Sequence, residues 1–328
     1  MNIKKRVTHP YKNWLLKGRF GGSHQPDETK KKNVILGRMV GIHRDEILLK
    51  IENAFNKMLT NPDMALYMRN VKDISIYGGL MLKAFYDEFL LKHNKEPYIK
   101  GPRDKKMKAV LKHLKIKGYS EVNVDNYPDI KCWQILDWDN KTEVEFSKLL
   151  ATKIIPECWK GSHTISKHSA NIASSVAEAI LNCKEHAYTS AKEDSIFKKF
   201  YLGVGEYPDE KHRFSFCVYD KGIGIKARLL ANPKTWFGEN FIDKTRTDSQ
   251  IIEMATQGKR VATEDGRGEG LKHAVETLAE NNGRIDIYSE RGYFTSANNN
   301  RGGKDMDACL EGTMVAFSFP IMYSEDNE

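Results

Sequence analysis

The feature that most constrains the fold of this chain is a glycine-rich loop that leads directly into an amphipathic helix. Gly266, Gly268 and Gly270 alternate with other residues, and apolar residues then recur at helical spacing, at Leu271, Ala274, Val275 and Leu278. Such a loop exposes free backbone amides and the positive end of the helix dipole, which together suit a phosphate group. The spacing G-x-G-x-G differs from the Rossmann pattern G-x-G-x-x-G and the Walker pattern G-x-x-x-x-G-K-[ST], neither of which occurs in the chain.

A second segment, residues 172–188, predicts a helix with one polar face. Its apolar residues lie at helical spacing and can pack on a sheet; they are Ile172, Val176, Ala179, Ile180, Cys183 and Ala187. Glu178, Asn182 and His186 follow one another at intervals of four, so they share one face of the helix. Taken alone, this face fits an ordinary polar surface as well as it fits a ligand site.

A third segment, residues 213–225, predicts a strand that ends in a D-x-G-x-G turn. The residues along it alternate in character, which predicts a strand that is half buried, with one face in the core. Phe214, Phe216 and Val218 lie on one face, and Ser215, Cys217 and Tyr219 lie on the other. Asp220 ends the strand, and Gly222 and Gly224 follow it. Glycines at alternate positions let the backbone approach a ligand closely or adopt a positive φ. Two more strands are expected, at residues 285–288 and 313–320.

Taken together, these segments resemble the GHKL superfamily of ATP-binding domains, which includes gyrase subunits, heat-shock chaperones, mismatch-repair proteins and sensor kinases. VAEAILNCKEHAY resembles the N-box, in the version found in anti-sigma-factor kinases, and YDKGIGI resembles the D-x-G-x-G box. GRGEGL resembles the second glycine box, and GTMVAFSFP resembles the closing strand. The likeness covers roughly residues 145–322. It implies an α/β (α+β) fold, a two-layer sandwich of helices on a mixed sheet, with residues 225–265 as the ATP lid.

The resemblance implies a nucleotide-binding role for residues of each box. Asp220 is expected to accept a hydrogen bond from the adenine amino group, and Thr313 to support that end of the site. Asn182 is expected to supply a side-chain oxygen to Mg²⁺, which prefers oxygen ligands and keeps several waters. Amides around residues 268–271 are expected to hold the phosphates. The predicted ATP-binding residues are Asn182, His186, Asp220, Gly222, Gly224, Ile225, Gly266, Arg267, Gly268, Gly270, Leu271 and Thr313.

Glu178 is the residue on which the expected mechanism depends. In ATPases of the family the matching glutamate polarises the attacking water, so the resemblance implies a general base. Its neighbours Asn182 and Mg²⁺ would place it near the γ-phosphate, where positioning and charge stabilisation supply most of the rate. A residue that only orients others and never handles a proton is the alternative, and it stays open.

The residues before these boxes predict a second, smaller α/β layer. Apolar spacing predicts helices at about residues 47–58, 80–91 and 107–114, and short strands at residues 71–76 and 98–99. The stretch VKDISIYGGLMLKAFYDEF resembles a STAS-type domain, in which a strand runs into a helix N-terminus that bears a phosphorylatable Ser or Thr. Tyr77-Gly78-Gly79 occupy that turn here. The resemblance therefore implies a docking or packing module that lacks the phospho-switch.

The 328 residues thus divide into a basic arm (1–32), a STAS-like domain (33–120), a connector (121–144), a GHKL domain (145–322) and a tail (323–328). The net charge of +8 and a Lys-rich helix at residues 105–117 permit contact with nucleic acid without demanding it. Five widely spaced cysteines without a C-x-x-C pair argue against a disulfide framework or a thiolate zinc site. No apolar run is long enough for a membrane span or a secretory signal, so a cytoplasmic location is expected.

These observations predict a Mg²⁺-dependent ATP-binding protein, a slow ATPase that reports its nucleotide state to a protein partner. The alternatives are a Ser/Thr protein kinase of the anti-sigma-factor type, a binding clamp without turnover, and a nucleic-acid-linked clamp that uses the basic N-terminal region. Family members often dimerise, so a homodimer is among the expected assemblies. A two-component histidine kinase is disfavoured, because His163 and His168 lie in S-H-T and K-H-S contexts and Glu185 replaces a lysine common in such kinases.

Overall fold

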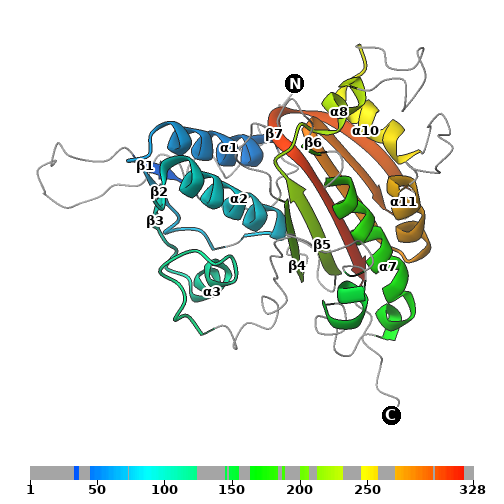
Figure 1. Ribbon diagram of the computed structural model, residues 1–328, viewed down its shortest axis with the longest axis horizontal. Coiled ribbons are helices and arrows are strands. Elements are labelled where there is room, and N and C mark those ends of the chain that lie inside the picture. The colour runs from blue at the N-terminus through cyan, green and yellow to red at the C-terminus, as the bar shows by residue number, and fades with distance from the viewer. Residues whose placement is uncertain are drawn as a thin grey trace, which may run out of the picture. The chain divides into compact units, whose positions relative to one another are not determined.

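Two separate β-sheets organise the protein in the computed structural model (Figure 1). Met1–Lys32 forms one unit of the chain and Asn33–Glu328 the other. The structure describes residues 33–36, 45–72, 74–123, 145, 148–154, 163–183, 187–188, 200–206, 213–231, 245–257, 270–297 and 300–320. The basic arm therefore lies outside the described residues. Helices accompany one parallel and one antiparallel sheet, so the predicted α+β class is confirmed at that level. The mixed sheet predicted for residues 145–322 is not found among the described strands, which pair antiparallel there.

The larger sheet is antiparallel and has the strand order β4-β5-β7-β6. Its strands are β4 (Phe200–Glu206), β5 (Arg213–Asp220), β6 (Arg284–Ala297) and β7 (Asn300–Pro320). The register pairs Asp220 of β5 with Thr313 of β7, and Thr313 with Ser289 of β6. These three residues therefore form a row across the sheet at the point where β5 ends. The strands predicted at 213–220, 285–288 and 313–320 are confirmed, and the last two are longer than expected.

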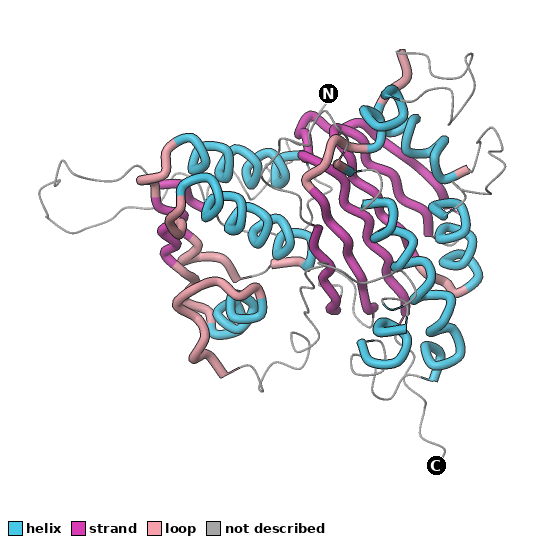
Figure 2. Tube along the Cα trace, in the orientation of Figure 1, coloured by secondary structure: helices cyan, strands magenta, loops and turns pink. Residues whose placement is uncertain are grey.

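Helices α7 (His163–Asn182) and α11 (Gly270–Glu280) pack on one face of this sheet (Figure 2). Val176 and Ile180 of α7 meet Phe216 and Val218 of β5 in a buried core, since inward-facing residues recur every second position along the strand. The apolar residues expected at helical spacing between 172 and 187 are all buried, as are Ala274, Val275 and Leu278. A π-helical segment, η1 (Leu150–Ile154), adds Leu150 to the same core.

The opposite face of the sheet is covered as well, by α1 (Asp45–Thr60) and α2 (Ile76–His93). Cys217 and Tyr219 of β5 are buried in this second core, and Tyr201 of β4 donates a hydrogen bond of 3.1 Å to Asp87 of α2. The prediction that β5 is half buried on one face is therefore wrong. The reason lies in α2, in which every residue from 76 to 86 is buried. A helix that is buried all round packs on more than one layer, and one side of α2 covers the second face of β5.

The front layer, which we define as the described residues between 33 and 123, contains the parallel sheet. Its strands β1 (Asn33–Ile35), β2 (Ala65–Tyr67) and β3 (Tyr98–Lys100) are adjacent in that order, with α1 and α2 as crossover connections. Helix α3 (Lys105–His113) follows β3. The three helices and the strand predicted at 98–99 are confirmed. The predicted domain boundaries at 120 and 145 remain predictions, because residues 124–144 lie outside the described residues.

The strand predicted at residues 71–76 is wrong. Ser75 is the N-cap of α2, and its side chain accepts a hydrogen bond of 3.2 Å from the Gly78 amide, which satisfies one of the free donors at the helix start. Gly78 and Gly79 therefore lie in the first turn of a helix rather than in a strand-to-helix turn. The described strand that precedes α2 is β2, several residues earlier. None of the described helices combines the length and apolarity that crossing a membrane requires.

Candidate functional site

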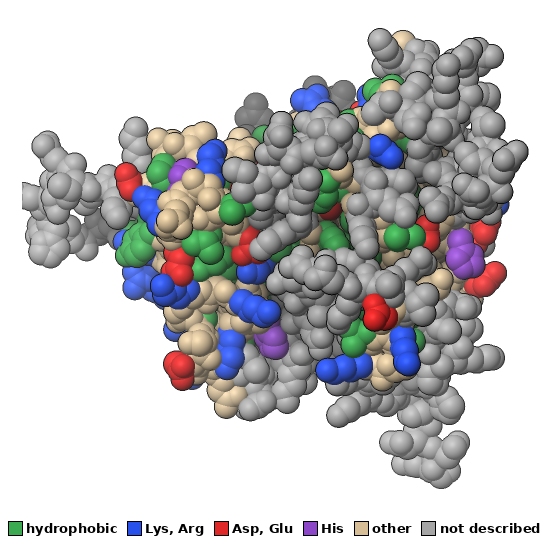
Figure 3. Space-filling model, in the orientation of Figure 1, with side chains coloured by type: hydrophobic (Ala, Val, Ile, Leu, Met, Phe, Trp, Pro, Cys, Tyr) green, Lys and Arg blue, Asp and Glu red, His purple; other side chains and the backbone are tan. Residues whose placement is uncertain are grey.

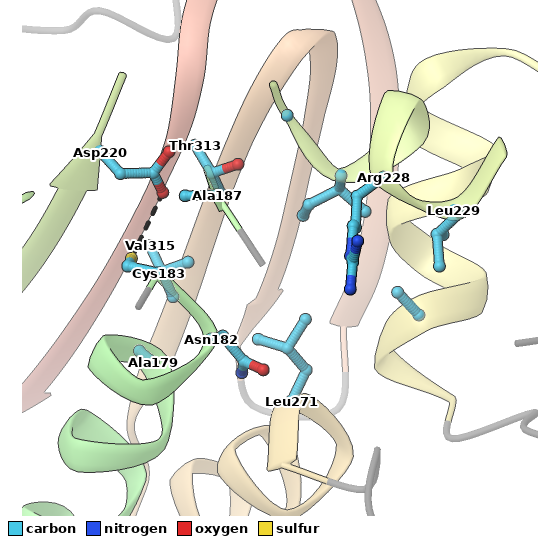
Figure 4. Close-up of a pocket in the computed structure, with 13 residues that line it drawn as sticks. Ala179, Asn182, Cys183, Ala187, Asp220, Arg228, Leu229, Leu271, Thr313 and Val315 are labelled. Atoms are coloured by element: carbon cyan, nitrogen blue, oxygen red, sulfur yellow. Dashed lines mark hydrogen bonds between the residues drawn. The ribbon is translucent and has the colours of Figure 1, made fainter. Parts of the chain in front are cut away.

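One pocket lies between α7, the end of β5, helix α8 (Ile225–Ala231) and the start of α11 (Figure 4). It encloses about 610 Å³ of space, a figure that includes its opening to solvent. Most of its walls are apolar. Six of the predicted site residues line it, namely Asn182, Asp220, Gly224, Ile225, Leu271 and Thr313. Segments far apart in the sequence thus meet around one cavity.

Asp220 is the buried carboxylate of this pocket, with 2% of its surface exposed. Its Oδ1 accepts a hydrogen bond of 2.7 Å from the Gly222 amide, and its Oδ2 accepts one of 3.3 Å from the Cys183 thiol. A buried carboxylate requires such donors, because it has lost its water. The two bonds fix the orientation of the carboxylate from the turn on one side and from the end of α7 on the other.

The Cys183 thiol acts as a donor here. Burial raises the pKa of this thiol well above its ordinary value, and the neighbouring Asp220 carboxylate raises it further. The protonated thiol is therefore the stable form, and it is the form that can donate to a carboxylate. A high pKa also argues against a nucleophilic role, because the thiolate is the reactive species.

The D-x-G-x-G turn requires its glycines for two different reasons. A Cβ on Gly222 would lie 2.3 Å from the Ala187 carbonyl oxygen, so only glycine lets the turn approach the segment that follows α7. The Ile223 amide donates a hydrogen bond of 2.9 Å to that same carbonyl. Gly224 has a φ of +83°, a conformation that side chains other than glycine rarely adopt. The turn is thereby held against the segment that follows α7, while Asp220 faces the pocket.

Ser289 is a structural residue of the site that the sequence patterns missed. Its hydroxyl oxygen accepts a hydrogen bond of 2.8 Å from the Ile225 amide and donates one of 3.2 Å to the Gly312 carbonyl. It also lies 3.2 Å from the Thr313 hydroxyl. Ser289 therefore ties the start of α8 to β7. No motif marks this serine, and only the register of β6 with β7 brings it beside Thr313.

Glu178 lies one turn before Asn182 on α7, and its carboxylate packs against the first residue of α11. A Cβ added to Gly270 would lie 2.0 Å from Glu178 Oε1, so the two residues are in direct contact. The positive end of the α11 dipole favours a negative charge at this position. The contact suits a residue that orients the start of α11, and it also places the carboxylate beside Gly270, the last glycine of the loop expected to hold phosphates.

Arg228 is a pocket-lining residue that the sequence patterns missed. It extends from α8 into the cavity (Figure 4). Its backbone amide donates a hydrogen bond of 3.2 Å to the Gly224 carbonyl. Arg228 therefore lies one helical turn after the last glycine of the D-x-G-x-G box, on the same side of the helix. That spacing was visible in the sequence and could have identified Arg228.

His186, Gly266, Arg267 and Gly268 lie outside the described residues, as do residues 232–244 and 258–265 of the predicted lid. The described part of the lid contains α8 and α10 (Asp248–Thr256). Within the described part of the chain, no three or more His, Cys, Asp or Glu side chains gather into a metal-binding group. The proposed metal ligand Asn182 lines the pocket with its amide.

The Lys-rich helix α3 has one buried face and one basic, solvent-facing side. Met107, Val110 and Leu111 are buried, whereas the lysines at positions 105 and 106 are exposed. Figure 3 shows several Lys and Arg side chains over the front layer on the face in view. Two lysines of this segment contact the chain itself, because Lys112 donates to the Val122 carbonyl at 2.7 Å and Lys117 pairs with Glu96 at 3.1 Å. A phosphate-binding role for the helix stays a prediction.

Comparison of the chain with protein-family models gives no match, and comparison with curated proteins gives none either. The GHKL and STAS-like resemblances therefore stay predictions, and the function must be argued from the geometry of the pocket.

Proposed function

We propose that the protein binds ATP with Mg²⁺, hydrolyses it slowly, and passes its nucleotide state to a protein partner. The observation that carries the proposal is the pocket itself. The N-box helix, the D-x-G-x-G turn, the start of α11 and the Gly312-Thr313 strand, predicted separately from the sequence, all contribute to its wall. A buried carboxylate and a helix N-terminus in one apolar cavity complement a molecule with an amino group on one end and phosphates on the other.

Asp220 supports adenine as the base. An ionised carboxylate is an acceptor only, and its two oxygens together can accept about four hydrogen bonds, of which the Gly222 amide and the Cys183 thiol supply two. The amino group of adenine can donate to it. Guanine presents a carbonyl oxygen at the same place, which would leave a buried acceptor facing another acceptor, an arrangement that is strongly disfavoured.

The start of α11 and the Asn182 amide support a phosphate end. Leu271 lines the pocket at the first turn of α11, where backbone amides are free of intrahelical partners. A single amide oxygen from Asn182 fits a Mg²⁺ ion, because that ion keeps several waters and takes its remaining oxygens from phosphates. The bound ion would neutralise part of the negative charge of the phosphates.

For hydrolysis we propose that Glu178 accepts a proton from water as the water attacks the γ-phosphorus and the bond to the β-phosphate oxygen breaks. Its contact with Gly270 keeps the carboxylate beside the phosphate-binding end. A fixed position matters, since most of the rate in phosphoryl transfer comes from positioning and charge stabilisation.

Lys221 supports the transfer of nucleotide state to the front layer. It follows Asp220 directly, but its ammonium pairs with Glu88 of α2 and, at 2.9 Å, with Glu311 of β7. A movement of the D-x-G-x-G turn would therefore act on α2 directly, through the ion pair between Lys221 and Glu88. The kinase and nucleic-acid-linked alternatives rest on the sequence alone, because the basic arm lies outside the described residues.

Calorimetry with purified protein tests the proposal. We expect the wild type to bind ATP in the presence of Mg²⁺ and to bind GTP at least tenfold more weakly. Asp220→Asn should lose ATP affinity severely, while the control Asp307→Asn, which changes an exposed carboxylate of β7, should not. No heat from folded wild-type protein at millimolar ATP and Mg²⁺ would refute the proposal.

A further inference from the structure

We infer that Arg228 binds the phosphates of the nucleotide from the α8 side of the pocket. The inference rests on the proposed ATP-binding function and extends it to a residue that lies outside the four sequence boxes. Arg228 enters the cavity opposite the wall formed by α7. In Figure 4 its guanidinium extends toward the side where Asn182 and Leu271 lie, across the pocket from Asp220.

The distribution of charge around the pocket supports this assignment. Of the described residues that line it, Asp220 and Arg228 carry the charges, and the others are neutral. The carboxylate is already engaged by the Gly222 amide and the Cys183 thiol. A ligand that matches this arrangement has a hydrogen-bond donor at the Asp220 end and an anion at the other. A nucleoside phosphate has both.

Guanidinium chemistry selects phosphate as the anion. The planar fork of an arginine can donate two parallel hydrogen bonds to a phosphate group, and its charge shortens and strengthens both. Apolar walls strengthen the attraction further, since little water screens it. The start of α11, where Leu271 lines the same cavity, would donate amides to the same group from another direction.

The structure holds α8 in place from several sides, so Arg228 is presented by an anchored helix. The Ile225 amide is bound to Ser289 at the start of α8. Lys226 pairs with Asp248 of α10 at 2.7 Å, and Leu229 is buried against Ile251 of α10. Because these contacts fix the helix, the ligand does not have to order the backbone that carries Arg228.

Affinity measurements across a series of adenine ligands test the inference. ATP, ADP and adenosine are titrated into wild type, Arg228→Met, Arg228→Lys and the control Arg291→Met, which removes an exposed charge of β6 that does not line the pocket. We expect Arg228→Met to weaken ATP binding about tenfold or more, the size of a charge-assisted hydrogen bond, and to leave adenosine binding within about twofold. Arg228→Lys should fall between, and Arg291→Met should match the wild type.

The ligand series separates failure of the inference from failure of the proposed function. Wild-type protein that binds neither ATP nor adenosine would refute both. Two outcomes would overturn only the phosphate contact. In the first, the wild type binds ATP and Arg228→Met binds it equally well; in the second, Arg228→Met loses the same affinity for ATP as for adenosine. If Arg228→Met does not fold, as judged by its thermal unfolding without ligand, Arg228→Lys decides: unchanged ATP affinity then overturns the bidentate contact.

Discussion

The Lys221 ammonium lies 2.9 Å from the Glu311 carboxylate, on the face of the sheet away from the pocket, whereas its neighbour Asp220 faces the pocket. Lys221 also pairs with Glu88 of α2. Burial alone lowers the pKa of Lys221, but the two carboxylates outweigh that effect and raise it, so the ammonium stays charged. Two successive residues therefore have different partners: Asp220 faces the proposed ligand, and Lys221 contacts the front layer.

Removal of the Lys221 charge should destabilise the protein. Lys221→Met would leave Glu88 and Glu311 close together without their cation, and we expect a loss of about 2 kcal/mol in the free energy of unfolding. A fully buried pair would lose more, but the Glu311 side chain is 49% exposed. Urea unfolding measures the effect. Lys95→Met, which breaks an exposed pair with Asp63, is the control and should change stability by less than about 1 kcal/mol. Equal effects of the two variants would contradict the prediction.

Glu52 of α1 lies in the same cluster and predicts a dependence of stability on pH. Burial raises the pKa of Glu52 from 4.5 to about 7, opposed by Lys221 and reinforced by Glu311 and Glu88. The folded state therefore holds this proton more tightly than the unfolded state. The stabilisation is complete below pH 4.5, falls as the pH rises toward 7, and is absent above that value. The loss amounts to about 3 kcal/mol.

Glu52→Gln isolates this contribution from those of other titrating groups. The glutamine cannot ionise, so its free energy of unfolding should exceed that of the wild type at pH 8 by about 2 kcal/mol, with a smaller difference at pH 5. Urea unfolding at several pH values between 5 and 8 measures the difference. A constant offset between the two proteins across this range would show that Glu52 titrates normally.

The parts of the fold that the sequence predicted depend on local patterns. The apolar spacing around Val176 and Ile180, and the alternation along β5, are complete within their own segments, so α7 and β5 could be predicted without knowledge of their neighbours. The pocket residues were predictable for the same reason, because Asn182 and Asp220 lie at the ends of these elements.

The features that the sequence did not predict depend on contacts between distant segments. Helix α2 is buried on all sides over residues 76–86, so its spacing does not reveal that it covers Cys217 and Tyr219 on the second face of β5. Ser289 meets Thr313 only through the pairing of β6 with β7. The Cys183 thiol was expected to be part of an apolar helix face, and only the folded chain brings it to Asp220.

The Cys183 thiol should affect base binding as well as stability. Cys183→Ala would remove a donor from Asp220 Oδ2, so we expect weaker adenosine binding, by about fivefold to tenfold, and Cys183→Ser should retain most of the affinity. Cys217→Ala is the matched control, because Cys217 is also buried but lies in the core on the other face of the sheet. It should lose stability without losing adenosine affinity. Calorimetric titration with adenosine measures the effect, and equal losses in both alanine variants would contradict it.

Glu178→Gln distinguishes a general base from an orienting residue. Glutamine keeps nearly the same shape, so the packing against Gly270 survives, but the amide cannot accept a proton from water. If Glu178 is the base, release of phosphate should fall by about 100-fold or more while the affinity for ATP with Mg²⁺ stays within about threefold. An orienting residue would give a different pattern. The Glu178→Gln variant would then retain most of the turnover, whereas Glu178→Ala, which removes the contact with Gly270, would lose it. Single-turnover phosphate release, measured beside the affinity, separates the two roles, and unchanged turnover in both variants would remove Glu178 from the mechanism.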